Sequence, residues 1–263
     1  MKLLVFLLAG SVALAEAQEI VTLQTRPGVT QSFFIASMGA RKPEAAALLL
    51  IGGGGNINLR TEGGQIKFGQ GNFLPRSRGE FIRNAILPVI LDNPSDQQAG
   101  QGMSDRFRES PAHAADMRVV AGEIKKRHPG LPVFVVGTSR STISAAYLAV
   151  ALDGEIAGAV LTSSYFYGGA RAMMPMLAGF DWSKVRMPLL LAHHVDDACQ
   201  WTPYRDAKRL GARFPLISVE GGKTPESGPC DPSAQHGFFG REAETVDAIA
   251  AWMLKRPFQK EIR

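Results

Sequence analysis

Residues 132–141 read PVFVVGTSRS, and the chain continues to residue 151 with a segment rich in Ala. The first half of this stretch is a short β-branched run, which predicts a buried strand, and the Ala-rich segment has the composition of a helix packed on a sheet. Ser139 therefore lies in a sharp turn between strand and helix. Such a turn needs small residues two positions before and after its centre, and Gly137 and Ser141 meet that need. A helix N-cap is the structural alternative for Ser139, because serine is a favoured cap.

The rest of the chain alternates short apolar runs with helical patterns, which predicts an α/β fold with a mainly parallel sheet and helices on its faces. Eight runs are candidate strands, at residues 19–24, 32–36, 46–51, 86–91, 133–136, 157–161, 189–192 and 216–219. Helices are predicted at residues 110–128, 140–151 and about 241–254. Residues 163–182 have no clear period and hold aromatic and Met residues, so a lid would lie there.

This order of elements, with Ser139 in the turn, resembles the α/β-hydrolase family. The resemblance covers nearly all of the chain after its first residues. It implies a mostly parallel eight-stranded sheet with a small lid or none, and a serine hydrolase whose nucleophile is Ser139. The family usually has Gly where this chain has Ser141, a change that the position tolerates because serine is small. Ser104 also follows a glycine by two residues, but the charged Arg106 fills its small position and no buried strand precedes it.

The family's triad follows the chain order nucleophile, acid, histidine, and the resemblance assigns the last two by position. The histidine follows the last strand, often before glycine and an aromatic residue, and here residues 236–238 read His-Gly-Phe. His236 is the expected general base. The acid follows the penultimate strand, often in a His-Gly-x-x-Asp pattern. Counting four residues from His193 gives Asp197 as the residue that orients His236, and Asp196 is the second candidate.

The resemblance also implies an oxyanion hole made of two backbone N–H groups. One belongs to the residue after the nucleophile, here Arg140. The other comes from the loop after the third strand, where residues 51–56 read IGGGGN, and Gly53 or Gly54 is the expected donor. A flexible turn is the alternative for this loop. A nucleotide-binding loop is a weaker interpretation still, because neither a Gly-Lys-Ser/Thr nor a G-x-G-x-x-G pattern opens a helix there.

The chain has two cysteines, Cys199 and Cys230. If the chain is exported, as its first residues predict below, an even count favours a disulfide, and two buried free thiols are the alternative. A bridge would tie the loop of the acid to the loop of the histidine.

A metal site is the rival reading of residues 193–199, which contain two His, two Asp and a Cys. Adjacent residues at a strand end point to opposite faces, and an oxidised cysteine is no ligand. No metal is therefore expected.

Composition supports one globular domain, because 45% of the 263 residues are hydrophobic and 20% are charged.

Residues 1–17 begin with Met-Lys, continue with a short apolar run and end in small residues, which predicts a signal peptide followed by a hydrolase domain at residues 18–263. The apolar run is too short for a stop-transfer helix, and a retained N-terminal anchor is the alternative. The mature protein is expected in the periplasm or secreted, with no stable membrane insertion.

The formal net charge of +5 comes from scattered Lys and Arg residues. The one dense basic cluster, at residues 125–128, ends a predicted helix, so no nucleic-acid partner is expected.

The expected function is hydrolysis of a small-molecule or polymeric carboxylic ester through an acyl-enzyme, without a cofactor. A serine peptidase or amidase of the same fold and a catalytically silent binding protein remain as alternatives.

Overall fold

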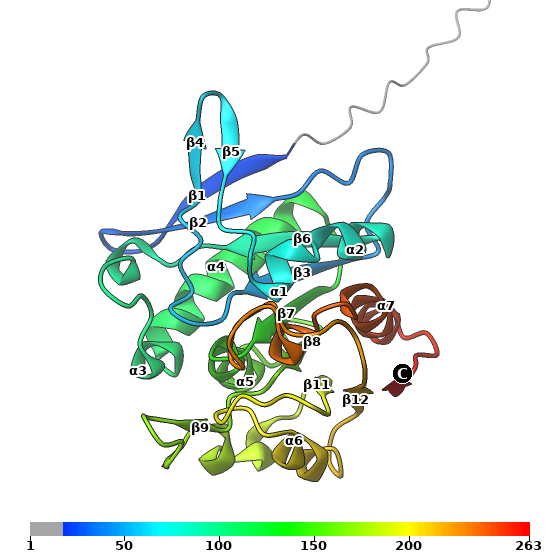
Figure 1. Cartoon of the computed structure of the whole chain (residues 1–263). Helices are drawn as coiled ribbons and strands as arrows, with labels where there is room; N and C mark the ends of the chain where they lie inside the picture. The colour runs from blue at the N-terminus through cyan, green and yellow to red at the C-terminus, as the bar shows by residue number, and fades with distance from the viewer. Residues whose placement is uncertain (1–17) are drawn as a thin grey trace, which may run out of the picture.

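A sheet of nine strands forms the centre of the described residues (Figure 1). The structure is a computed structural model that describes residues 18–263, and the expected signal peptide at residues 1–17 lies outside the described residues. The strands are β1 (Glu19–Arg26), β2 (Val29–Ile35), β3 (Ala45–Leu50), β6 (Ile86–Leu91), β7 (Val133–Thr138), β8 (Gly158–Thr162), β11 (Leu189–His194), β12 (Leu216–Val219) and β13 (Glu261–Ile262). Their order is β1-β2-β6-β3-β7-β8-β11-β12-β13. β2 is antiparallel to β1 and β6, and the other neighbouring pairs are parallel.

The prediction of a mostly parallel sheet flanked by helices is confirmed, and all eight predicted strands are present. The difference is β13, a two-residue strand that pairs with β12 near the end of the chain and makes the sheet nine-stranded. A two-residue strand is too short to show an apolar period, so the sequence pattern could not predict it.

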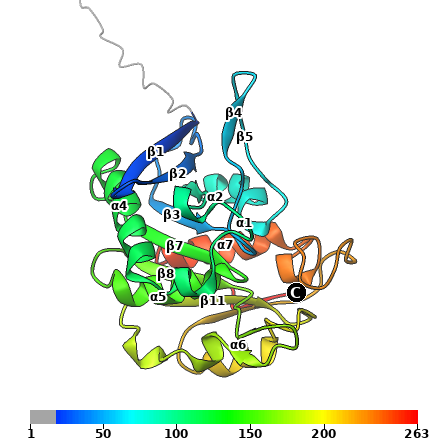
Figure 2. The same cartoon turned by 90° about the vertical axis from the view of Figure 1, so that its left-hand side faces the viewer.

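Helices cover both faces of the sheet because both faces are apolar. Every residue of β3 is buried, with Leu48 in the core that contains α4 (Pro111–Arg127) and α5 (Ser141–Ala151). Leu49 points to the opposite core, which contains α2 (Arg78–Arg83) and α7 (Glu242–Met253). This is the alternation expected of a strand buried on both sides. Figure 2 shows α4 and α5 on one side of the sheet and α7 on the other.

The remaining elements are short. They are α1 (Phe73–Arg76), α3 (Asp105–Arg108), α6 (Tyr204–Leu210), four 3-10 turns at residues 95–97, 177–179, 182–184 and 235–237, and two hairpins, β4 (Arg60–Glu62) with β5 (Gln65–Lys67) and β9 (Tyr167–Gly168) with β10 (Met174–Pro175). The β4–β5 hairpin projects away from the sheet (Figures 1 and 2). The β9–β10 hairpin lies within residues 163–182, so the segment predicted as a lid is small. Within residues 18–263, no helix combines the length and the apolar character needed to cross a membrane.

Helix α4 begins with the signals that the sequence predicted. The Ser110 side chain accepts a hydrogen bond from the His113 N–H at 3.2 Å, and Pro111 occupies the first helical position. His113 is buried, and within residues 18–263 neither of its ring nitrogens has a hydrogen-bond partner. Burial, reinforced by the charges of Arg108 and Arg26, lowers the pKa of His113 to about 3.

The neutral state of His113 predicts a pH-dependent stability. Between the ordinary pKa of 6.5 and about 3, the unfolded chain binds a proton at His113 that the folded chain does not bind. The free energy of unfolding therefore falls as the pH drops below 6.5, and His113 contributes about 1.4 kcal/mol per pH unit. We expect the free energy of unfolding, measured with denaturant between pH 6 and pH 4, to change with pH by about one proton less in His113→Leu than in the unaltered protein. If the free energy of unfolding changed equally with pH in the two proteins, His113 would titrate normally in the folded state.

Candidate active site

Ser139 occupies the turn between β7 and α5. Its φ of 53° lies in the left-handed region, which is strained for a residue with a side chain, and its N–H donates to the Thr162 carbonyl of β8 at 2.9 Å. The N-cap residue of α5 is Arg140, so Ser139 is not the helix cap that the alternative required. Ser139 is partly exposed, while every residue of β7 before it is buried.

The positions that the sequence required to be small are crowded by backbone. A Cβ on Gly137 would lie 2.4 Å from the Ser141 carbonyl oxygen, so only glycine fits there. A Cβ on Gly52 would lie 3.1 Å from the Cβ of Ser139, which places the glycine loop directly against the serine. Ser141 fits because its hydroxyl is hydrogen-bonded: it donates to the Ile51 carbonyl and accepts from Arg108 Nη1 at 2.6 Å.

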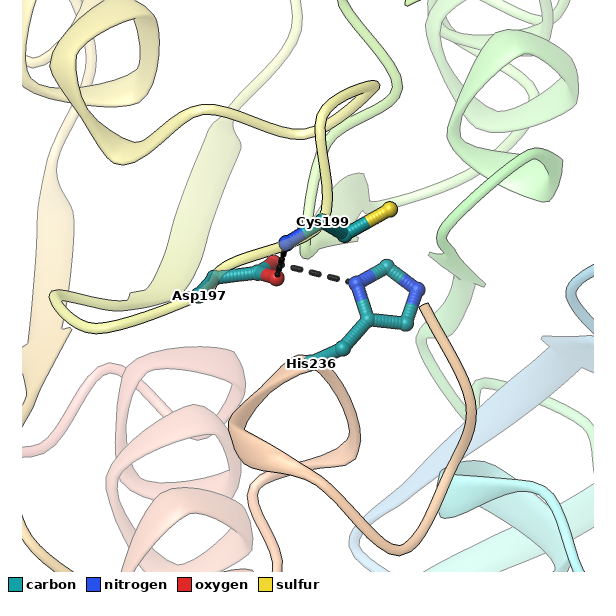
Figure 3. Close-up of side chains that lie close together, drawn as sticks. All are labelled: Asp197, Cys199 and His236. Atoms are coloured by element: carbon teal, nitrogen blue, oxygen red, sulfur yellow. Dashed lines mark hydrogen bonds and ion pairs between the residues drawn. The ribbon is translucent and has the colours of Figure 1, made fainter. Parts of the chain in front are cut away.

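Asp197 and His236 meet where β11 and the histidine loop converge (Figure 3). His236 Nδ1 lies 3.0 Å from Asp197 Oδ2, and the other ring nitrogen points away from the carboxylate. Both side chains are buried. The second carboxylate oxygen, Oδ1, accepts from the Cys199 N–H at 3.0 Å (Figure 3). Asp196, the other candidate acid, is exposed.

Thr202, which the sequence did not single out, and His193 complete the surroundings of Asp197. The Thr202 hydroxyl donates to Asp197 Oδ2 at 2.8 Å and lies 3.2 Å from His236 Nδ1. His193 Nε2 donates to the Thr202 carbonyl at 2.8 Å and lies 3.4 Å from Asp197 Oδ2. Burial alone would raise the pKa of Asp197, but the hydrogen bonds from His193 and His236 hold that pKa well below its usual range. Asp197 is therefore ionised at neutral pH.

Ser139 and the histidine loop are both anchored at the carboxyl end of β8. The Ser139 N–H bonds to Thr162, the last residue of that strand. The next residue, Ser163, has a φ of 48° and donates its hydroxyl to the His236 carbonyl at 2.7 Å. Arg76 holds the other side of the loop through the Gly237 carbonyl at 3.0 Å. The turn and the histidine loop are thus held at neighbouring residues of one strand end.

Three carbonyl groups of the glycine loop, those of Gly52, Gly53 and Gly54, have hydrogen-bond donors. The Gly52 carbonyl accepts from the Gly55 N–H at 3.2 Å, the Gly53 carbonyl from Arg108 Nη2 at 2.8 Å, and the Gly54 carbonyl from Asn93 Nδ2 at 2.8 Å. Within residues 18–263, no protein acceptor bonds to the N–H of Gly53, Gly54 or Arg140. In a trans peptide the C=O of one residue and the N–H of the next point in opposite directions. The hydrogen bonds of the Gly52 and Gly53 carbonyls therefore fix the N–H directions of Gly53 and Gly54.

Cys199 and Cys230 form a disulfide that closes a separation of 31 residues. The Cys199 N–H also contacts the carboxylate of Asp197, so the bridge holds the backbone that orients this acid.

Removing the bridge is expected to cost stability. Closing a loop of this length removes unfolded-state entropy worth about 3 to 4 kcal/mol. We expect a reductant, or the Cys199→Ser/Cys230→Ser pair, to lower the melting temperature measured by circular dichroism. The double variant should not respond to the reductant, which controls for unspecific effects. A melting curve of the unaltered protein that does not move on reduction would contradict this stabilisation.

The residues of the rival metal site are engaged in other contacts. Asp197, Cys199 and His236 have ligand atoms within 4.8 Å of one another, but Cys199 Sγ is bonded to Cys230. The rings of His193 and His194 bond to different carbonyls, those of Thr202 and Gly221. Their side chains therefore diverge, as expected for neighbours at a strand end.

Several solved structures share this architecture. An α/β serine hydrolase homologue from Coxiella burnetii is 12% identical, with a TM-score of 0.57 over 92% of this chain and 99% of that one. A lid-less α/β serine hydrolase from Xanthomonas campestris is 15% identical, with a TM-score of 0.55 over 88% and 94%. An esterase from Pyrococcus furiosus is 15% identical, with a TM-score of 0.53 over 78% and 83%. The sequence itself matches no family model and no curated protein. These likenesses and the mainly parallel sheet show that the chain has the fold of the α/β-hydrolase superfamily.

Proposed function

We propose that this protein is a serine hydrolase that cleaves carboxylic esters through an acyl-enzyme on Ser139. The observation that carries the proposal is the 3.0 Å hydrogen bond between buried Asp197 and His236, at the edge of the sheet where Ser139 is held in a left-handed turn. Asp197 and His236 make the acid–histidine contact of a catalytic triad, and the proton transfer from Ser139 to His236 is part of the proposal. The similar structures support the proposal, because they are those of a serine hydrolase homologue, a serine hydrolase and an esterase.

The proposed reaction begins with His236. Its Nδ1–H donates to Asp197, which leaves Nε2 free to accept the proton of the Ser139 hydroxyl. The serine oxygen then bonds to the ester carbonyl carbon, and the negative charge moves to the carbonyl oxygen. The N–H of Arg140 and that of Gly53 or Gly54 stabilise this oxyanion. As the intermediate collapses, the bond to the alcohol oxygen breaks, and His236 returns its proton to the departing alcohol.

The second half of the reaction releases the acid. Water loses a proton to Nε2 of His236 and attacks the acyl carbon, and the same N–H groups hold the second oxyanion. The bond to Ser139 then breaks, and His236 reprotonates the serine. Asp197 stabilises the imidazolium in both halves, because it is ionised and buried beside the ring. This chemistry requires no cofactor.

The proposal extends to the setting of the enzyme. A disulfide next to the acid suits an oxidising compartment, so we propose that residues 18–263 act as one hydrolase domain in the periplasm or outside the cell. The partner is a small-molecule or polymeric ester.

A fluorophosphonate probe and an ester panel test the proposal together. We expect the probe to label Ser139, and nitrophenyl esters of graded acyl length to be hydrolysed by the same preparation. Cleavage of peptides or amides without ester cleavage would favour a peptidase or amidase. A folded protein that neither labels nor turns over would be a binding protein on this scaffold.

A further inference from the structure

Arg108 is a buried cation whose position the proposed triad does not explain. It ends α3, its side chain is among the largest fully buried ones, and within residues 18–263 it forms no ion pair. Burial and the nearby charge of Arg140 lower the pKa of Arg108 to about 9, so it remains protonated at neutral pH. The charge of Asp105 opposes this lowering of the pKa, but Asp105 forms no ion pair with Arg108. A buried charge without an ion-pair partner is costly unless surrounding dipoles solvate it. Its hydrogen-bond acceptors therefore indicate what it does.

The acceptors of Arg108 belong to the two segments that enclose Ser139. Nη2 donates to the Gly53 carbonyl at 2.8 Å, and Nη1 donates to the hydroxyls of Ser141 at 2.6 Å and Ser144 at 3.3 Å. Gly53 lies in the glycine loop, while Ser141 and Ser144 lie in the first turn of α5. The Ser141 hydroxyl then donates to Ile51, at the start of the same loop. One planar guanidinium thus joins the glycine loop to the helix that follows the nucleophile.

This contact acts on the direction of the loop's peptide groups. Fixing the Gly53 carbonyl on Arg108 also fixes the Gly54 N–H of the same peptide plane, which points the opposite way. A cation on the carbonyl polarises that peptide and strengthens its N–H as a donor. The glycines themselves cannot hold this geometry, because they have no side chains and wide conformational freedom.

We propose that Arg108 is a positioning residue that holds the glycine loop against the nucleophile turn, with its peptide N–H groups oriented toward the oxyanion. The inference rests on the proposed ester hydrolysis. It also accounts for Ser141, which stands where the family usually has glycine: the hydroxyl supplies an acceptor for Arg108 and a donor for Ile51. Arg108 acts through backbone groups and does not touch the reacting atoms.

The test compares Arg108→Met, Arg108→Lys and Ser141→Gly with the unaltered protein. Methionine keeps an unbranched apolar stem and removes the charge and the donors, so we expect kcat to fall about 10²-fold, as on loss of one oxyanion donor, with KM changing less than about three-fold. Lysine keeps the charge but lacks the planar fork, so its loss should be intermediate, on the order of ten-fold. Ser141→Gly should lose kcat by a smaller factor than Arg108→Met.

A transition-state analogue separates positioning from a merely structural role. The inhibition constant of phenylboronic acid, which forms a tetrahedral adduct with a serine, should rise in each variant by the factor by which kcat/KM falls. Arg118→Met is the matched control, because Arg118 is half-exposed on α4 and pairs with Glu155. It should leave both constants unchanged. Melting temperatures ensure that rates are compared in folded protein.

The outcomes are distinguishable. If the unaltered protein hydrolyses esters and folded Arg108→Met keeps its kcat, the positioning role is wrong and the proposed function stands. If Arg108→Met does not fold, Arg108→Lys and Ser141→Gly decide, and an unchanged kcat in both overturns the role. If the unaltered protein neither hydrolyses esters nor labels at Ser139, both proposals fail.

Discussion

Ser139→Ala is expected to lower kcat for ester hydrolysis by at least about 10³-fold and to abolish labelling by a fluorophosphonate probe. Without the hydroxyl no acyl-enzyme can form, and the remaining rate comes from substrate binding and the oxyanion donors. The fold should tolerate the change, because alanine is smaller than serine and Ser139 is partly exposed. Steady-state kinetics on the ester panel and a circular dichroism melt measure both effects.

The control for this prediction is Ser183→Ala. Ser183 is exposed and its hydroxyl donates to Asp181, so its loss should leave kcat within about two-fold. If folded Ser139→Ala kept turnover within about ten-fold of the unaltered protein, another residue would have to be the nucleophile. Ser104 would not be a natural replacement, because its side chain accepts from the Phe107 N–H at 3.1 Å and caps α3.

The parts of the fold that the sequence predicted are those with strong local patterns. Strands such as β7 and β11 begin with four apolar residues in a row, and α4 has a serine cap, a proline and a long period. The elements that were missed, such as α1 and α3, have four residues each. A helix of one turn has no measurable period and forms because tertiary contacts hold it.

The candidate site was reached through chain order and the chemistry of residue types. Asp197 and His236 could be placed because the carboxyl ends of parallel strands lie at one edge of a sheet. Their supporting residues have no such signal: Ser163 contacts the His236 carbonyl across 73 positions of sequence, and Arg108 reaches Gly53 across 55. Ser141, which stands where the family usually has glycine, was the one local sign in the sequence of unusual packing at this turn.

The second large effect is expected at Asp197, where Asp197→Asn should lower kcat on the order of 10³-fold. Asp197 accepts hydrogen bonds from Cys199, Thr202 and His236, so the carboxylate is used on both oxygens. If the asparagine oxygen keeps the hydrogen bond from the Cys199 N–H, the asparagine NH₂ group faces His236 Nδ1. That nitrogen then has to accept a hydrogen bond instead of donating one. The ring proton moves to Nε2, and that nitrogen can no longer take the Ser139 proton. The imidazolium also loses its counter-charge.

The melting temperature of Asp197→Asn separates a loss of catalysis from a loss of folded protein. The depressed pKa of Asp197 means that the ionised carboxylate stabilises the folded state above its unfolded pKa, and that this contribution is lost as the pH falls through the folded pKa. Asp197→Asn lacks this contribution at neutral pH, so its melting temperature should fall, and its kinetics should be measured well below that temperature. An unchanged kcat in the folded variant would remove Asp197 from the reaction.

Asp196→Asn is the matched control for this experiment, because it makes the same chemical change one residue earlier on an exposed side chain. Its kcat and melting temperature should stay close to those of the unaltered protein. The pair is decisive because the sequence left both aspartates open as the acid, whereas in the structure Asp197, and not Asp196, has a hydrogen bond to the His236 ring. If Asp196→Asn lost activity and Asp197→Asn kept it, the acid assignment would have to be reversed, and with it the tautomer that the proposed mechanism requires of His236.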